Sequence, residues 1–222
     1  MLHASVKRMK RPLYSIILPV RNEAQSLPIL VREIKSAMGV KPYEIITVDD
    51  GSTDGSVGTI SIAHQGKWTA LRTGIAKARG NIIITMDADL QDDPKEILSL
   101  LKKLHEGFDV VSGWRKRRRD PLYKIALTSI ANAFYGYHDF ASPMKAYRIE
   151  ALRELPIEGA FLRYSFLFAQ KLGMKIVEIP VSHRERIYGK SKFGPIKYFR
   201  ILYDIILISL IFRGSGKLRR ET

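Results

Sequence analysis

The segment with the clearest chemical signature is Asp87-Ala88-Asp89-Leu90-Gln91, which directly follows the apolar run at residues 81–86. A buried strand that ends in two carboxylates and an amide can hold a divalent cation. Mg²⁺ prefers oxygen ligands, keeps several waters and is usually shared with substrate phosphates. The segment therefore predicts a metal site for a nucleotide-diphosphate substrate. The alternative is that the aspartates only cap the next helix.

Alternating strand and helix patterns surround this segment. Residues 14–20 and 44–49 are short apolar runs, and the apolar residues between them recur at helical spacing, which predicts a βαβ unit. Residues 67–79 repeat the helical pattern before Gly80, and residues 81–86 are typical of a buried parallel strand. Asp93 and Pro94 predict the start of another helix, and residues 109–112 another strand.

The second half of the chain is less regular. Residues 121–137 and 161–172 are predicted helices, and residues 175–181 a strand. The polar segment 183–194 is predicted to be a mobile loop. In the last predicted helix, 195–212, the apolar run 201–212 is shorter than the about 20 residues that span a bilayer. It is predicted to lie in the membrane interface, or alternatively to pack against the domain.

Composition limits the class of protein. With 222 residues, of which 45% are hydrophobic, the chain suits one globular domain. The absence of cysteine excludes disulfides and thiolate metal sites, and the absence of a signal-peptide pattern favours a cytoplasmic location. The net charge of +15 is concentrated at residues 1–12, 115–120 and 183–222, which favours contact with phosphates or an anionic membrane. Nucleic acid is disfavoured because stacking aromatics do not interleave with these runs.

Three polar clusters follow predicted strands, namely residues 19–23, 49–54 and 87–91. Each cluster alone has the residue types of an ordinary turn. Ligands of open α/β sheets bind at the carboxyl ends of the strands, so together the clusters predict one acidic rim around a ligand site.

Several motifs in a fixed order carry a family resemblance: Pro19-Val20-Arg21-Asn22-Glu23, Val48 to Gly55, Gly66-Lys67, Arg79-Gly80 and Asp87 to Gln91. Together they resemble the family 2 glycosyltransferases of GT-A fold, an α/β class with a mostly parallel sheet flanked by helices. Gly113-Trp114-Arg115, Ala146-Tyr147-Arg148 and Arg186 to Lys192 are similar to the branch of dolichol-phosphate mannosyltransferase and polyprenyl-phosphate glycosyltransferases. The resemblance covers residues 14–212 and favours the metal site over simple capping.

The resemblance implies roles for particular residues. Pro19, Glu23 and Asp50 would contact the nucleoside part of the donor, with Glu23 on the ribose and Asp50 on the base, and Arg21 would also bind substrate. Asp87, Asp89 and Gln91 would hold Mg²⁺ or Mn²⁺ and the diphosphate. Four residues would bind phosphates of the donor or of the acceptor, namely Arg115, Arg186, Ser191 and Lys192. Lys124 would also bind substrate. Catalytic roles fall to Asp89, Arg115 and Arg186, whereas residues 116–119 suit a solvated charge run.

The expected function is inverting, metal-dependent transfer of a hexose from a donor of the GDP-mannose or UDP-glucose type to a polyprenyl or dolichyl phosphate. This acceptor is already anionic at neutral pH, so no side-chain base is needed. The expected organisation is a basic segment 1–13, a catalytic domain 14–194 and a helix with a basic tail, 195–222, on the cytoplasmic face of the membrane. The alternatives are transfer to a glycan or glycolipid hydroxyl, or a non-catalytic basic peripheral membrane or nucleic-acid-binding protein.

Local departures from the family pattern give further expectations. The short segment 55–64 predicts a truncated sheet edge, and Pro143-Met144 replaces the Gly-Phe that is usual before Lys145. Asp139 is either the family's acid in this region or a cap. His138 and His183 lack metal-ligand spacing and are interpreted as ordinary polar residues.

Overall fold

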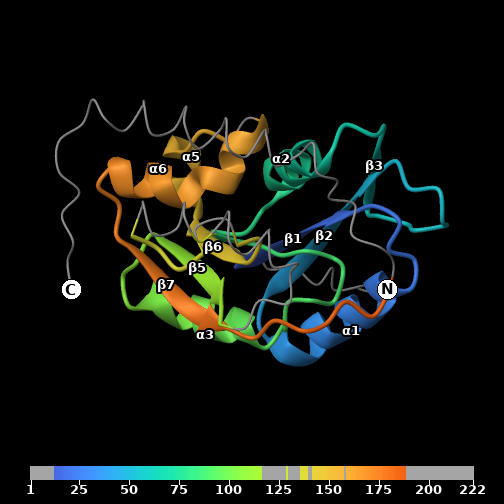
Figure 1. Cartoon of the computed structure of the whole chain (residues 1–222), viewed down its shortest axis with the longest axis horizontal. Coiled ribbons are helices and arrows are strands. Elements are labelled where there is room, and N and C mark those ends of the chain that lie inside the picture. Colours follow the sequence, from blue (N-terminus) through green and yellow to red (C-terminus); the bar gives the residue numbers. More distant parts are fainter. Residues whose placement is uncertain (1–12, 117–128, 130–135, 140–141, 158, 189–222) are drawn as a thin grey trace, which may run out of the picture.

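The structure is a computed structural model that describes residues 13–116, 129, 136–139, 142–157 and 159–188. Within these residues a seven-stranded sheet has the order β3-β2-β1-β4-β6-β5-β7. Helices cover both of its faces, with α1 and α3 on one side and α2, α5 and α6 on the other (Figure 1). All neighbouring strands are parallel except β6, which is antiparallel to β4 and β5.

The strands are β1 Tyr14–Val20, β2 Tyr43–Asp50, β3 Ile60–Ile62, β4 Ile82–Thr85, β5 Val110–Arg115, β6 Lys145–Arg148 and β7 Ile176–Val181. The helices are α1 Ser26–Met38, α2 Lys67–Lys77, α3 Glu96–His105, α5 Ile149–Glu154 and α6 Ser165–Lys171, with a 3₁₀ helix η1 at Gly159–Tyr164.

Each face of the sheet packs its own apolar cluster, because successive side chains of a strand point to opposite faces. Ile16 and Leu18 of β1 join the cluster that contains Leu30 of α1 and Leu100 of α3. Ile17, between them, joins the opposite cluster with α2, α5 and α6. Strand β1 is thus buried on both faces, which explains its continuous apolar sequence.

The predicted α/β class and the βαβ units are confirmed. Strand β4 falls within the predicted run 81–86, and β7 within 175–181. Strand β3 has only three residues and lies at the sheet edge, in agreement with the short segment 55–64.

Other local expectations differ from the structure. Helix α3 begins at Glu96 because Asp93 accepts the N–H groups of Lys95 and Glu96 and forms a turn before the helix. The predicted helix 161–172 begins as η1 and becomes α-helical at Ser165, whose buried hydroxyl shares a hydrogen bond with Tyr147.

Several predictions lie outside the described residues: the basic segment 1–12, most of the helix 121–137, the loop beyond residue 188, and the helix and basic tail 195–222. Within the residues that are described, no helix has the length and apolar character needed to cross a bilayer.

Candidate active site

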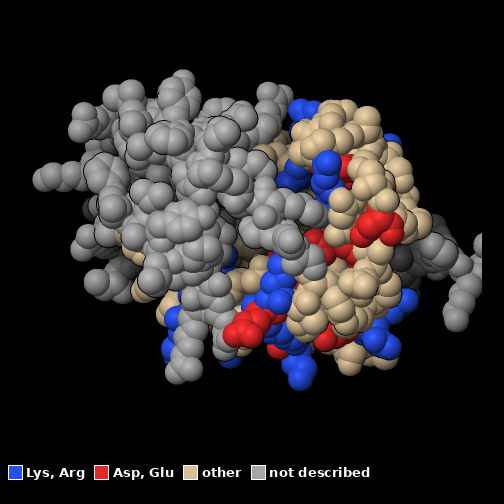
Figure 2. All heavy atoms as spheres, turned by 45° about the vertical axis from the view of Figure 1, so that its right-hand side comes forward, with Lys and Arg blue, Asp and Glu red and all other residues tan. Residues whose placement is uncertain are grey.

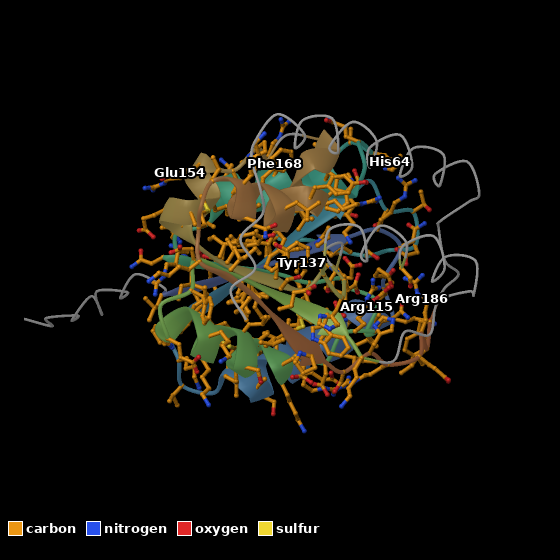
Figure 3. All side chains as sticks on the ribbon, turned by 60° about the vertical axis from the view of Figure 1, so that its left-hand side comes forward. His64, Arg115, Tyr137, Glu154, Phe168 and Arg186 are labelled. Carbon is orange, nitrogen blue, oxygen red and sulfur yellow. The ribbon has the colours of Figure 1, made fainter. Side chains whose placement is uncertain are left out.

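Three of the parallel strands, β1, β2 and β4, end at the same edge of the sheet, where the predicted acidic rim forms. Arg186 shows that the residues following β1 and β4 lie close together, because its Nη2 donates to Glu23 Oε1 at 3.1 Å and to Asp89 Oδ2 at 3.0 Å. Glu23 Oε2 accepts the hydroxyl of Ser26 at 2.6 Å. In the view of Figure 3, His64, Arg115 and Arg186 project toward one side of the molecule. Residues from both ends of the described chain thus meet at one site.

The two aspartates after β4 each form an ion pair with a cation of the chain. Lys67 Nζ lies 2.5 Å from Asp87 Oδ1, and Arg186 holds Asp89. On the face in Figure 2, acidic and basic side chains lie next to one another instead of forming separate patches. Burial, and then the charge of Asp87, raises the pKa of Asp89 to about 6, against the opposing charge of Arg186. Arg186 therefore does not fully offset the burial of Asp89 and its repulsion from Asp87.

The turn that carries these carboxylates has unusual backbone geometry. Leu90 is buried and has a φ of 63°, in the left-handed region that residues with a Cβ rarely adopt. This turn lets the Gln91 N–H donate to Asp89 Oδ1 at 3.2 Å. Such conformations persist where the surroundings enforce them, and they are concentrated at functional sites.

The residues present fit a hard divalent cation. No cluster of three or more acidic, histidine or cysteine side chains that could hold a metal is found among the described residues, so a metal bound by Asp87 and Asp89 would have no further such ligand there. Two carboxylates suit Mg²⁺ or Mn²⁺, whose remaining coordination positions are filled by waters and substrate phosphates. The side-chain nitrogen of Gln91 lies 3.5 Å from the Arg184 carbonyl oxygen and 3.4 Å from His183 Nε2. The predicted metal role of Gln91 stays a prediction.

Asp50 organises the loop between β3 and α2. Its carboxylate accepts the N–H groups of Gln65 at 2.7 Å and Gly66 at 3.0 Å, and lies 2.8 Å from His64 Nδ1. Arg21 Nη1 is 3.9 Å away. A base-contacting role for Asp50 stays a prediction, and these bonds add a structural role. His64, half exposed, was missed because one histidine in a loop carries no spacing signal.

The turn after β1 and the loop after β2 bind each other through hydrogen bonds from backbone N–H groups to side-chain oxygens. The Asn22 N–H donates to Ser52 Oγ, and Asn22 Oδ1 accepts the Thr53 N–H. Asn22 has a φ of 50° and begins the turn that follows β1. The Glu23 N–H donates to Ser56 Oγ at 2.8 Å. Pro19 lies in β1 opposite Val48, so the end of β1 and the loop after β2 form one wall of the site.

Arg115, at the end of β5, is bound to Asp139. Its Nε donates to Asp139 Oδ2 at 2.6 Å and its Nη2 to Oδ1 at 3.1 Å, and both side chains are largely buried. The Asp139 N–H donates to Glu178 Oε1. From the sequence, Asp139 is either the family's acid or a cap. The geometry adds a third role, that of ion-pair partner to Arg115. At the end of β5, the guanidinium of Arg115 is therefore already paired with the carboxylate of Asp139.

Both histidines have specific surroundings. His138 stacks on Trp114 with ring centroids 4.6 Å apart. The side chain of His183 is buried, 3.9 Å from Asp92. The remaining predicted site residues, Lys124, Ser191 and Lys192, lie outside the described residues.

Comparison with known proteins agrees with this geometry. The family model described as Glycosyl transferase family 2 matches residues 15–166. A dodecaprenyl-phosphate galacturonate synthase of Rhizobium johnstonii is 33% identical over 91% of this chain and 68% of its own length. An undecaprenyl-phosphate 4-deoxy-4-formamido-L-arabinose transferase of Yersinia enterocolitica is 33% identical over 86% of the chain and 66% of its own length. The chain thus spans about two thirds of the length of these relatives.

Solved structures share the fold. Glucosyl-3-phosphoglycerate synthase from Mycobacterium tuberculosis, in complex with Mg²⁺ and uridine diphosphate, superposes with a TM-score of 0.70 at 19% identity, covering 94% of this chain and 81% of that one. A mannosyltransferase from Pyrobaculum calidifontis, in complex with GDP-Man and Mn²⁺, gives a TM-score of 0.66 at 22% identity, covering 94% and 66%.

Proposed function

This chain belongs to glycosyl transferase family 2, and we propose that it transfers a sugar from a nucleotide-diphosphate sugar to a polyprenyl or dolichyl phosphate. The names of the two curated relatives, both of which use a polyprenyl phosphate, support this acceptor. The acceptor lipid and the net charge of +15 support a peripheral position on a membrane, which we propose to be its cytoplasmic face.

One observation carries the proposal: Glu23, Asp87 and Asp89 meet at the carboxyl edge of the sheet, with Arg186 bound between Glu23 and Asp89. A divalent ion held by Asp87 and Asp89, with Gln91, would stabilise the negative charge of the leaving diphosphate. Arg186 and Lys67 lie against the same carboxylates and are placed to bind diphosphate oxygens.

The reaction is a single displacement with inversion. An oxygen of the acceptor phosphate forms a bond to the anomeric carbon as the bond from that carbon to the donor diphosphate breaks. The electron pair of that bond leaves with the nucleoside diphosphate. The acceptor phosphate carries its own negative charge at neutral pH, so the step needs no proton transfer to the protein. Asp139, bound to Arg115, is then not needed as a base.

The test compares two acceptors with the same tail. The full chain, with Mg²⁺ or Mn²⁺ and labelled UDP- or GDP-sugars, should glycosylate a polyprenyl phosphate and not the matching polyprenol. The product should be a sugar phosphodiester whose anomeric centre is inverted, as determined by NMR. Efficient transfer to the alcohol or to a glycan would replace the proposal with a hydroxyl-acceptor enzyme, and metal-dependent nucleotide binding without any transfer would favour a non-catalytic role.

Asp89→Asn should abolish transfer, because this carboxylate is a proposed metal ligand. The matched control is Glu154→Gln, since Glu154 is exposed at the end of α5 and lies away from Arg186 in Figure 3. Full turnover in Asp89→Asn would exclude the proposed metal site.

A further inference from the structure

Beside the proposed metal site lie a buried acid and a buried histidine that the proposed mechanism does not use. Asp92 is 1% exposed, and the side chain of His183 is 4% exposed. Neither carboxylate oxygen of Asp92 has a hydrogen-bond partner among the described residues, and the same is true of His183 Nδ1. Buried polar atoms are normally paired, so these exceptions need a physical reason.

The imidazole of His183 links Asp92 to Gln91. Its Nδ1 is 3.9 Å from Asp92 Oδ1, and its Nε2 is 3.4 Å from the side-chain nitrogen of Gln91. The first distance is too long for a hydrogen bond. Functional hydrogen bonds are often long in a ligand-free protein and tighten when the site is loaded. The ring thus connects a buried carboxylate to a residue predicted to contact the metal.

The side chain of Gln91 determines which nitrogen of this ring carries the hydrogen. The carbonyl oxygen of Arg184, which can only accept, lies 3.5 Å from the same side-chain nitrogen of Gln91. The amide therefore turns its nitrogen to this side, with one hydrogen for the carbonyl oxygen and one for His183 Nε2. Nε2 accepts only when it is unprotonated, so the neutral ring carries its hydrogen on Nδ1, which faces Asp92.

This arrangement orients the amide group of Gln91. The last torsion of a glutamine side chain is broad and roughly two-fold, so an unrestrained amide could turn either its oxygen or its N–H groups toward a cation. Only the oxygen can bind a cation. Because His183 and Arg184 both attract the nitrogen, the oxygen on the other arm of the amide is left for a metal.

The backbone around His183 is fixed against the same turn. His183 and Asp92 form an antiparallel bridge, and the Arg184 N–H donates to the carbonyl oxygen of Gln91 at 2.7 Å. The guanidinium of Arg184 lies 2.8 Å from Asp93. The imidazole therefore approaches the Gln91 amide from a defined position.

We infer that His183 is a positioning residue, which, together with Asp92, turns the amide oxygen of Gln91 toward the proposed metal. His183 touches neither metal nor substrate in this role and acts through Gln91. Outer partners of this kind fix the orientation of a metal ligand, and their loss weakens metal binding. The inference rests on the proposed function and adds to it a reason for two buried polar groups.

The experiment compares two substitutions of His183 in the full chain. The amide of glutamine reaches about as far along the side chain as Nε2 of histidine, and that of asparagine about as far as Nδ1. His183→Gln therefore keeps an acceptor for the Gln91 amide, whereas His183→Asn keeps only the group that faces Asp92. Electron paramagnetic resonance measures the Mn²⁺ affinity of each protein, with UDP and in a separate titration with GDP, without sugar or acceptor.

His183→Asn should weaken Mn²⁺ binding about tenfold or more, as expected for the loss of an outer partner. His183→Gln should bind Mn²⁺ nearly as well as the wild type. His105→Asn is the matched control and should leave the affinity unchanged, because His105 is exposed at the last position of α3. A role in packing alone would not make glutamine a better replacement than asparagine for the metal.

A second measurement needs no variant. Nitrogen NMR of the ¹⁵N-histidine-labelled wild type, with Mg²⁺ and nucleotide, distinguishes protonated from unprotonated ring nitrogens. His183 should carry its hydrogen on Nδ1 and show an unprotonated Nε2. If His183→Asn does not fold, as judged by circular dichroism, this measurement decides.

Four results would overturn the inference: a hydrogen on His183 Nε2, an equal loss of Mn²⁺ affinity in both variants, no loss in either, or tighter Mn²⁺ binding by His183→Asn than by His183→Gln. The last result would assign His183 to Asp92 alone. The proposed function fails separately, if the wild-type protein binds Mn²⁺ and nucleotide but transfers no sugar to any prenyl phosphate. Absence of Mn²⁺ binding by the wild type would overturn both.

Discussion

Replacing Lys145 with methionine should stabilise the ligand-free protein near neutral pH, and this gain should shrink as the pH rises. Lys145 is buried, and its pKa is lowered from 10.5 to about 7 in the folded protein. Between these pH values the unfolded chain binds more protons than the folded protein, so wild-type stability rises with pH. The loss of wild-type stability caused by burying Lys145 is therefore complete below about pH 7. It is absent above 10.5, the pKa of this lysine in the unfolded chain.

The magnitude follows from linkage. The interval from 10.5 to about 7 corresponds to about 5 kcal/mol at about 1.36 kcal/mol per pKa unit. Methionine is an unbranched side chain of similar length, so the change of core volume adds little. Between about pH 7.5 and about pH 9.5, the stability advantage of Lys145→Met over wild type should fall by about 3 kcal/mol.

Urea unfolding of both proteins at these two pH values measures this difference directly. Lys103→Met serves as the control, because Lys103 is paired at the surface of α3 and its loss should change stability equally at both pH values. The same advantage at both pH values, or a variant less stable than wild type near pH 7.5, would show that Lys145 has a compensating partner and refute the reasoning.

Three further predictions concern the proposed metal site and the core. Because the pKa of Asp89 is raised to about 6, protons should compete with Mg²⁺ below that pH, weakening metal-dependent nucleotide binding in calorimetry about tenfold per pH unit; an affinity that is flat with pH would contradict this. Arg186→Ala should bind Mn²⁺ more tightly in the absence of nucleotide, as seen by electron paramagnetic resonance, since Arg186 occupies Asp89; unchanged Mn²⁺ affinity counts against such competition. Gly74→Ala should lower the free energy of unfolding by about 1–3 kcal/mol, because its Cβ would collide with Ile17; wild-type stability in urea would mean that β1 shifts freely.

Local sequence patterns were enough to predict much of the arrangement of strands and helices. The apolar runs that became β1, β2 and β4, and the helical spacing of α1, are properties of neighbouring residues, so a sequence contains them directly. The position of Asp87 and Asp89 at the end of a buried strand is equally local. Strand β6 was missed because its four residues are too few to show a period, and because a central antiparallel strand depends on its neighbours β4 and β5.

The tertiary structure alone decided which charges meet. Arg186 lies 97 positions from Asp89 and 163 from Glu23 in the chain, yet one guanidinium nitrogen contacts both. No local pattern predicts such a pair, because the strand order and the path of the chain after β7 determine it. The same holds for Lys145, which lies beside the carboxyl end of β4 only because β6 runs antiparallel to β4 and β5. Residue types supplied the chemistry, and long-range strand pairing determined which groups lie close together.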